Sequence, residues 1–188
     1  MSETQHYPPY PPTDRVIPEG EDRERLVCRQ CRHIFYENPK VIVGAVCVWE
    51  DRYLLCRRAI EPRKGFWTMP AGYLELSEAT DKGAIREVWE EASARIVVDG
   101  LLALYNLPII SQVHLIYRGR MVSPDHAPGI ESLETGLFAW DEIPWNDLAY
   151  PNVAWSLRHH RDLVGQTAFA PRGIPEDGWD GWTGWRAE

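Results

Sequence analysis

Three glutamates in one short segment carry the strongest chemical signal in this sequence. Glu87, Glu90 and Glu91 stand at positions i, i+3 and i+4. On a helix their carboxylates would project from one face, with Cβ atoms about 5–6 Å apart. Three anions this close repel one another, whereas an all-oxygen site of this kind suits a hard divalent cation, Mg²⁺ in particular. A solvated acidic helix face is the simpler alternative, and the surrounding residues decide against it.

The segment 72–94 resembles the Nudix box, the signature of a family of Mg²⁺-dependent hydrolases that act on nucleoside diphosphates linked to another moiety. The box reads glycine, five residues, glutamate, seven residues, then Arg-Glu-aliphatic-x-Glu-Glu-x-Gly-aliphatic. A chance match of six fixed residues is on the order of 10⁻⁸ per window. Ser93 departs from the pattern where glycine is expected, at a helix end that often needs a left-handed residue. The matching residues are Gly72, Glu78, Arg86, Glu87, Val88, Glu90 and Glu91, with Ala94 as a small apolar residue in the last place.

This resemblance implies a role for each box residue. Arg86 would hold the glutamates in place, as its i, i+4 relation to Glu90 allows, and Glu78 would support the cluster from the start of the helix. Bound Mg²⁺ or Mn²⁺ would neutralise the charge of a pyrophosphate and lower the pKa of a water molecule. The implied metal ligands are three carboxylates and one backbone carbonyl: Glu87, Glu90, Glu91 and Gly72.

The identity of the catalytic base stays open at this point. In the family it is either a box glutamate, here Glu87 or Glu90, or an acid from a later loop. Glu131 and Glu134 lie in the corresponding region, ahead of an apolar segment that reads as a strand. Either of these two could instead be an ordinary loop acid.

Cations and aromatic residues gather between the first predicted strand pair and the box. The planar donor groups of Arg57, Arg58 and Arg63 suit a diphosphate, although a solubilising surface patch is the alternative. Strand alternation means that either Arg57 or Arg58 must face away from the site. Trp67 could stack on an adenine or flavin ring, or it could belong to the core.

Cys28 and Cys31 have the Cys-x-x-Cys spacing of a zinc knuckle. One branch of the Nudix family, related to NADH pyrophosphatases, carries a four-cysteine zinc ribbon before its catalytic domain, and this chain resembles that branch. Here the other cysteine pair is missing, because Cys47 and Cys56 fall within predicted strands. We therefore expect a degenerate ribbon without a complete zinc site. The histidines that could supply a further ligand are His6 and His33.

Apolar periodicity predicts the elements that position these residues. The run 41–49 reads as a strand buried on both faces, with residues 53–58 as its hairpin partner. Ser77 is the expected N-cap of a helix that ends near Ser93. Further strands are expected at 96–107, 113–121 and 137–140, and helices at 145–149 and 152–164. These elements fit an α/β fold with a mixed sheet between helical layers, the α/β/α sandwich that the resemblance to the Nudix family implies. The core-facing side of the box helix is expected to be Ile85, Val88, Trp89 and Ala92.

Composition indicates three segments along the 188 residues. Residues 1–37 form a Pro-rich segment and the ribbon-like knuckle, and residues 38–165 form the Nudix domain. Residues 166–188 form a tail rich in tryptophan and glycine. This tail is either irregular or an arm that docks its tryptophans over the active site or onto another subunit.

Charge and hydropathy exclude several classes of protein. A net charge of −8, from 20 cationic and 28 anionic side chains, argues against general nucleic-acid binding. No apolar run approaches the ~18 residues of a membrane span, and no signal peptide is evident. Four cysteines without a secretion signal favour a reducing compartment, so we expect a cytoplasmic protein.

The resemblance implies hydrolysis of the pyrophosphate bond of ADP-ribose or FAD, with release of AMP and a phosphorylated product, by a homodimer. One alternative is a Nudix-fold regulator that binds such ligands without cleaving them. Another is an NADH pyrophosphatase, although the Ser-Gln-Pro-Trp-Pro-Phe-Pro-x-Ser segment of those enzymes is not present.

Overall fold

A computed structural model describes residues 12–176 and residue 178. The predicted Pro-rich segment before Pro12, His6 and the tryptophans beyond residue 178 lie outside these residues. The chain divides into two compact units, Met1–Pro39 and Lys40–Glu188. In the first unit, β1 (Thr13–Val16), β2 (Arg25–Cys28) and β3 (Ile34–Phe35) form an antiparallel sheet in the order β1-β2-β3.

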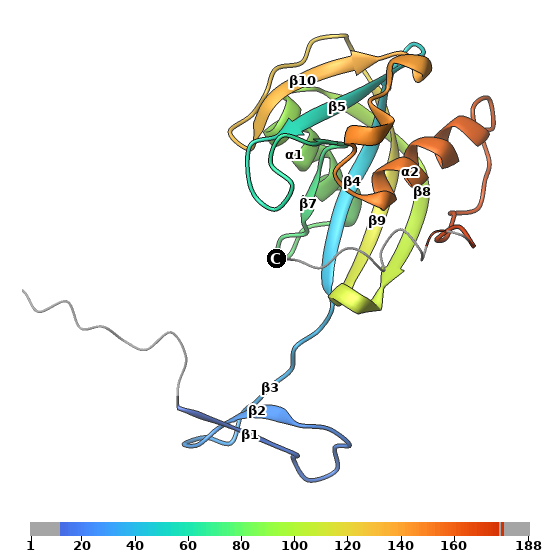
Figure 1. Ribbon diagram of the computed structural model, residues 1–188. Coiled ribbons are helices and arrows are strands. Elements are labelled where there is room, and N and C mark those ends of the chain that lie inside the picture. The colour runs from blue at the N-terminus through green and yellow to red at the C-terminus, as the bar shows by residue number, and fades with distance from the viewer. Residues whose placement is uncertain (1–11, 177, 179–188) are drawn as a thin grey trace, which may run out of the picture. The chain divides into compact units, whose positions relative to one another are not determined.

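The second unit is built on a seven-stranded sheet whose main path is β10-β5-β4-β9-β8 (Figure 1). Its central strands β4 and β9 are parallel, while the other pairings are antiparallel, so the sheet is mixed as predicted. The middle of β4 is fully buried, as its unbroken apolar run requires. The strands are β4 (Lys40–Trp49), β5 (Arg52–Arg58), β8 (Ile96–Leu107), β9 (Gln112–Met121) and β10 (Ser132–Phe138).

Strand β4 has two partners along the same side. Its last residues pair with β5, whereas residues 42–44 pair with β7 (Ala71–Tyr73). The short strand β6 (Trp67–Thr68) pairs with β5 instead. Residues 67–73 therefore cross from β5 to β4. A Cβ atom on Gly44 would overlap with Ala71, so glycine is needed for this close approach.

Two helices cover opposite faces of the sheet (Figure 1). Helix α1 (Thr80–Ala92) packs through Val88 and Ala92 against Ala45 and Cys47 of β4. Helix α2 (Pro151–Asp162) packs on the face that carries Val46. Because successive strand residues point to opposite faces, residues 45, 46 and 47 serve the two cores in turn. The α/β/α sandwich predicted from the sequence is thus confirmed.

Residues 169–174, within the predicted tail, lie against the edge strand β8. The Leu104 N–H donates to the Arg172 carbonyl at 2.9 Å, and the Arg172 N–H donates to the Leu102 carbonyl at 2.9 Å. Phe169 and Ile174 pack against the α2-side core. This part of the chain covers an edge that would otherwise be open to pairing.

Several local predictions were wrong. Helix α1 begins at Thr80, because Ser77 has a φ of 63° and belongs to the turn before it. Trp89 is 50% exposed and lies beneath the Arg95 guanidinium, outside the core. Strand β10 begins at Ser132 instead of 137. The helix expected at 145–149 is one 3₁₀ turn, η3 (Trp145–Asp147); the other 3₁₀ turns are η1 (Pro108–Ile110) and η2 (Trp140–Glu142).

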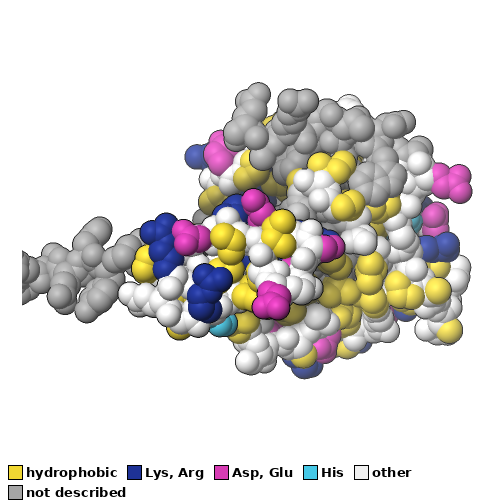
Figure 2. Space-filling view, turned by 90° about the horizontal axis from the view of Figure 1, so that it is seen from below, with side chains coloured by type: hydrophobic (Ala, Val, Ile, Leu, Met, Phe, Trp, Pro, Cys, Tyr) yellow, Lys and Arg dark blue, Asp and Glu magenta, His cyan; other side chains and the backbone are white. Residues whose placement is uncertain are grey.

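The surface mixes residue types. On the face shown in Figure 2, hydrophobic side chains are interspersed with charged side chains of both signs. Among the described residues, no helix combines the length and apolar character needed to cross a bilayer.

Candidate active site

The three box glutamates lie in the second half of α1, at the wall of a cavity. Glu87 and Glu91 are buried, at 8% and 9% exposure, whereas the Glu90 side chain is 55% exposed. The helix therefore places two carboxylates inside the protein and one at the opening. This is the spacing expected for residues three and four apart on one helical face.

Arg86 joins the acidic residues of the box. Its Nη1 donates to Glu87 at 2.7 Å and to Glu90 at 3.0 Å. Its Nε and Nη2 donate to the Glu78 carboxylate at 2.8 and 2.9 Å, and Nη2 also donates to the Tyr73 carbonyl at 3.0 Å. The guanidinium lowers the pKa of Glu78 to about 2. Arg86 thus links Glu78, near the start of the box, to Glu87 and Glu90 near its end.

The position of the Glu87 side chain requires a glycine at residue 72. A Cβ atom built on Gly72 would overlap with the Glu87 carboxylate. The backbone of β7 therefore passes directly against this carboxylate, which no larger residue would permit. The structure thus brings Gly72 and Glu87, two of the predicted metal ligands, into contact.

The end of α1 positions a fourth carboxylate. Ser93 adopts φ 49° and ψ 24°, the left-handed conformation for which the box normally supplies glycine. The loop after β9 then returns to the helix, where the Ala127 N–H donates to the Ala92 carbonyl at 2.8 Å and the Gly129 N–H donates to the Glu91 carbonyl at 3.0 Å. These bonds satisfy carbonyls of the last helical turn, and they hold the loop that carries Glu131 beside the box.

Burial dominates the electrostatics of this cluster. The pKa of Glu91 is raised to about 8, first by burial and then by the charge of Glu87. The Ala71 N–H, 3.4 Å from the Glu91 carboxylate, and the Arg58 charge act in the opposite direction. Burial also raises the pKa of Glu87, although Arg86 opposes this effect. Burial therefore disfavours the ionised form of both buried carboxyl groups in the metal-free site.

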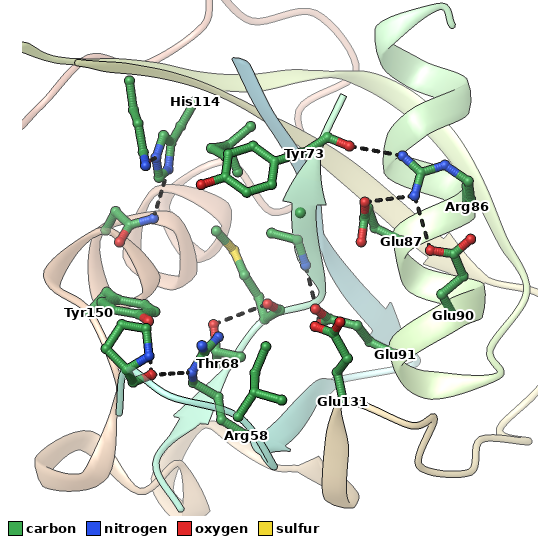
Figure 3. Close-up of a pocket in the computed structure, with 18 of the residues that line it drawn as sticks. Arg58, Thr68, Tyr73, Arg86, Glu87, Glu90, Glu91, His114, Glu131 and Tyr150 are labelled. Carbon is green, nitrogen blue, oxygen red and sulfur yellow. Dashed lines mark hydrogen bonds and ion pairs between the residues drawn. The ribbon is translucent and has the colours of Figure 1, made fainter. Parts of the chain in front are cut away.

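These residues open onto a cavity of about 740 Å³, shown in Figure 3. Glu87, Glu90, Glu91 and Glu131 lie on one side of it. His114 and Tyr150 lie on the other side, and Arg58 also lines the cavity. The volume is within the range of small-molecule sites, about 300–1,000 Å³.

Other residues predicted for the site lie elsewhere. Of the two candidate loop acids, only Glu131 lines the cavity; Glu134 forms an ion pair with Arg57 at 3.6 Å. Arg57 faces away from the cavity and Arg58 faces it, in keeping with strand alternation. Trp67, expected as a stacking surface or a core residue, packs in the core against Phe138, with ring centroids 4.9 Å apart.

Arg63 is also absent from the described cavity wall. Its guanidinium lies over the Phe66 ring, 5.2 Å from the centroid. The loop between β5 and β6 bends back at this point, since Arg63 has a φ of 65°. The expected cluster of three arginines is therefore reduced to Arg58 at the cavity.

Sequence reasoning missed the polar residues on the far side of the cavity. Gln112 and His114 line it from β9, and Asn152 and Tyr150 line it from the start of α2. Alternation along β9 places Gln112 and His114 on one face, which was the available signal. Nothing in the local sequence indicates that Asn152 reaches the same cavity.

The acidic cluster is the part of the cavity that could hold a divalent cation. Within the described residues, no three His, Cys, Asp or Glu side chains are gathered as a ready metal site. Figure 3 shows the reason: Glu87 and Glu90 turn toward Arg86, and Glu91 turns toward Glu131. The donor set itself fits Mg²⁺, because it consists of carboxylate oxygens. Coordination would require these side chains to rotate.

In the first unit, Cys28 is buried and Cys31 is exposed. The backbone N–H groups of Cys31 and Gln30 lower the pKa of the Cys28 thiol. His33, one of the two candidate additional ligands, packs its ring edge-on against Phe35 at 4.8 Å. The described part of this unit thus offers a Cys-x-x-Cys knuckle alone.

Comparison with known proteins agrees with this geometry. The sequence model of the NUDIX domain matches residues 38–160, and a zinc-ribbon model described as Nudix N-terminal matches residues 11–37. Among solved structures, a NUDIX hydrolase from Nitrosomonas europaea is 45% identical with a TM-score of 0.81, covering 87% of this chain and 94% of that one.

Two curated relatives are more distant. A MutT-like protein from Streptomyces ambofaciens is 35% identical over 55% of this chain and 66% of its own length. An ADP-ribose pyrophosphatase from Methanocaldococcus jannaschii is 30% identical over 41% of this chain and 46% of its own length. The chain thus spans between about half and two thirds of these relatives. Because the NUDIX match covers most of the chain and the box residues meet at one cavity, the chain belongs to the Nudix family.

Proposed function

We propose that this chain hydrolyses the pyrophosphate bond of a nucleoside diphosphate linked to another moiety, with Mg²⁺ or Mn²⁺ as cofactor. The observation that carries the proposal is the cavity in which Glu87, Glu90, Glu91 and Glu131 meet and which Arg58 also lines. The similarity to a protein named ADP-ribose pyrophosphatase favours ADP-ribose, with FAD as a second substrate of the same class.

The acidic cluster suits a cation by its charge. Glu91 is buried, and among the described residues it has no ion pair within 4.0 Å, unlike Glu87 and Glu90. When bound by these carboxylates, a divalent ion would neutralise phosphate charge and lower the pKa of a water molecule toward neutrality. Its positive charge would also favour the ionised form of Glu91.

Glu131 is the candidate general base. It lies beside Glu91 on the same side of the cavity, in a loop bonded to the last turn of α1. Its charge is close enough to raise the pKa of both Glu87 and Glu91. A carboxylate in this position can take a proton from the attacking water.

Arg58 is the candidate phosphate-binding cation. Its Nε donates to the Pro62 carbonyl at 2.9 Å, and its guanidinium lies over the Tyr150 ring, 5.3 Å from the centroid. These contacts hold the plane of the guanidinium at the cavity wall. A planar donor group held in this way suits the outer oxygens of a diphosphate.

The proposed reaction consumes one water molecule. The water oxygen bonds to one phosphorus atom, the bridging P–O bond breaks, and the bridging oxygen leaves with the other phosphate. ADP-ribose would yield AMP and a phosphorylated sugar. An enzyme that instead hydrolyses nucleoside triphosphates to nucleoside monophosphates would release inorganic pyrophosphate.

Chromatography of the products from ADP-ribose, FAD and nucleoside triphosphates, with Mg²⁺ or Mn²⁺, tests the proposal. We expect AMP from ADP-ribose or FAD, with a kcat/KM at least about tenfold above that for any triphosphate, which is ~1.4 kcal/mol. Pyrophosphate as the main product from a triphosphate would contradict this substrate class.

A pair of variants tests the acidic cluster. Glu90→Gln keeps the side-chain size but removes an anionic donor, and kcat should fall by about 10² or more, ~3 kcal/mol. Glu134→Gln is the matched control, since Glu134 lies outside the cavity; its kcat should stay within about twofold of the wild type. Wild-type turnover by Glu90→Gln would refute the metal-binding role.

A further inference from the structure

A chain of hydrogen bonds lies at the side of the cavity opposite the carboxylates. Asn152, in the first turn of α2, is 5% exposed, and its Nδ2 is 3.2 Å from His114 Nδ1. His114 Nε2 is 2.8 Å from Gln112 Oε1. The Asn152 carbonyl Oδ1 is the one buried side-chain polar atom of the described residues without a hydrogen-bond partner. Leaving such an atom unpaired costs free energy that a ligand donor would restore.

The directions of these bonds are mutually consistent. Gln112 Oε1 can only accept, so His114 carries its proton on Nε2 and accepts at Nδ1. Asn152 must then donate through Nδ2, which leaves Oδ1 as the unpaired atom. Burial lowers the pKa of His114 to about 4, so the ring stays neutral and this arrangement persists near pH 7. Because an amide nitrogen carries two protons, Asn152 can offer a donor beside its acceptor.

The position of Asn152 separates it from the reaction centre. His114, Ile42 and Tyr73 are register partners across β9, β4 and β7, and all three line the cavity from one face of the sheet. Figure 3 shows His114 on the opposite side of the cavity from Glu87, Glu90, Glu91 and Glu131. Apolar side chains that line the cavity include Ile42, Met69 and Ile110. A wall of apolar side chains and neutral polar groups suits a flat, uncharged ring better than a phosphate.

We propose that Asn152, oriented by Gln112 and His114, recognises the amino edge of an adenine base. This inference rests on the proposed function, since it assigns the nucleoside half of the same substrate. Oδ1 accepts a hydrogen bond from the N6 amino group, and the second Nδ2 proton is donated to the adjacent ring nitrogen. An amide pairs with adenine in this bidentate manner in protein–nucleic acid complexes.

The same geometry rejects hypoxanthine. That base carries a carbonyl oxygen in place of the N6 amino group, so its oxygen would face Asn152 Oδ1. Two acceptors would then be opposed, and Oδ1 would remain unpaired. A site built to bond a polar group discriminates strongly against an analogue that lacks it.

Binding of AMP and IMP to the full-length protein, measured by calorimetry, tests the inference. The wild type should bind AMP at least about tenfold more tightly than IMP. Asn152→Leu, which keeps the side-chain size but removes both polar groups, should bring the two affinities within about threefold. Asn106→Leu is the matched control, because Asn106 is exposed on β8 and lies outside the cavity; it should retain the wild-type ratio. Asn152→Ala repeats the test should the leucine variant not fold.

Equal wild-type affinity for AMP and IMP would overturn the inference, as would a tenfold preference that persists in a folded Asn152 variant. Because these ligands bind without turnover, the result does not depend on hydrolysis. A protein that selects AMP through Asn152 but cleaves no diphosphate would support this inference and contradict the proposed function. A protein that cleaves ADP-ribose and its hypoxanthine analogue with equal kcat/KM would support the proposed function and overturn this inference.

Discussion

Replacing Glu91 by glutamine should stabilise the metal-free protein at alkaline pH. Glu91 is 9% exposed, and among the described residues no cation lies within 4.0 Å of its carboxylate, so its charge is poorly accommodated. Glutamine has nearly the same shape as the protonated acid, and its side-chain oxygen can still accept the Ala71 N–H. The substitution therefore removes the buried charge and keeps the hydrogen bond.

The magnitude follows from the pKa of Glu91, which rises from 4.5 to about 8 on folding. A group whose pKa is higher in the folded state contributes stability that is fully present below pH 4.5 and is lost as pH rises to about 8. At 1.36 kcal/mol for each pH unit, the loss is at most about 5 kcal/mol. Relaxation of the site reduces this, so we expect Glu91→Gln to gain about 2–4 kcal/mol at pH 8.5 and less than about 1 kcal/mol at pH 5.

Urea unfolding with a metal chelator, at pH 5 and pH 8.5, measures this difference. Glu90→Gln is the matched control for the loss of one carboxylate from the same helix, because that side chain is 55% exposed; its effect should stay within about 1 kcal/mol at both pH values. Mg²⁺ should stabilise the wild type more than Glu91→Gln at pH 8.5. A Glu91→Gln protein that is no more stable than the wild type at pH 8.5 would refute the reasoning.

Three further predictions concern the surroundings of the cluster. Ser93→Gly should raise the free energy of unfolding by up to about 1 kcal/mol in urea unfolding, since Ser93 has a φ of 49° and glycine adopts this conformation without strain. Gly129→Ala should lower kcat by about tenfold or more in the ADP-ribose assay, because its Cβ would overlap with the Glu90 carbonyl and displace the loop that carries Glu131; unchanged kcat would show that the loop does not position the base. Elemental analysis should find clearly less than one zinc per chain, with Cys28 and Cys31 the only cysteines of the first unit. Stoichiometric zinc would show that the knuckle is completed by other ligands.

The box helix could be predicted because its information is local. The i, i+3, i+4 spacing places the glutamates on one face whatever lies around them. Ser93 occupies the left-handed position that the pattern assigns to glycine, since the helix must end there for the chain to enter β8. Individual strands followed in the same way from the apolar runs, and β8 agrees at both ends with the predicted range 96–107; their arrangement in a mixed sheet was implied by the resemblance to the Nudix family.

The rest of the site depends on contacts between distant parts of the chain. Local sequence could not separate Glu131 from Glu134, because the bonds from Ala127 and Gly129 to the end of α1 decide which acid reaches the box. The position of Trp67 was equally hard to predict, because it depends on a short strand beside β5 that packs this side chain against Phe138 of β10, far along the chain. Tertiary packing overrides the local expectation in both cases.

The buried carboxylates that are proposed to bind the metal ion also lower the stability of the metal-free protein. Glu87 and Glu91 are buried at a cost that Arg86 offsets only for Glu87, through an ion pair of 2.7 Å. A site with enough internal cations to relieve Glu91 would be more stable without metal, but it would bind a divalent ion less tightly because the carboxylates would already be neutralised. A buried carboxylate without an internal cation partner therefore favours the binding of a divalent ion, and the instability expected in the metal-free state at alkaline pH has the same physical origin as the cofactor binding proposed for this cavity.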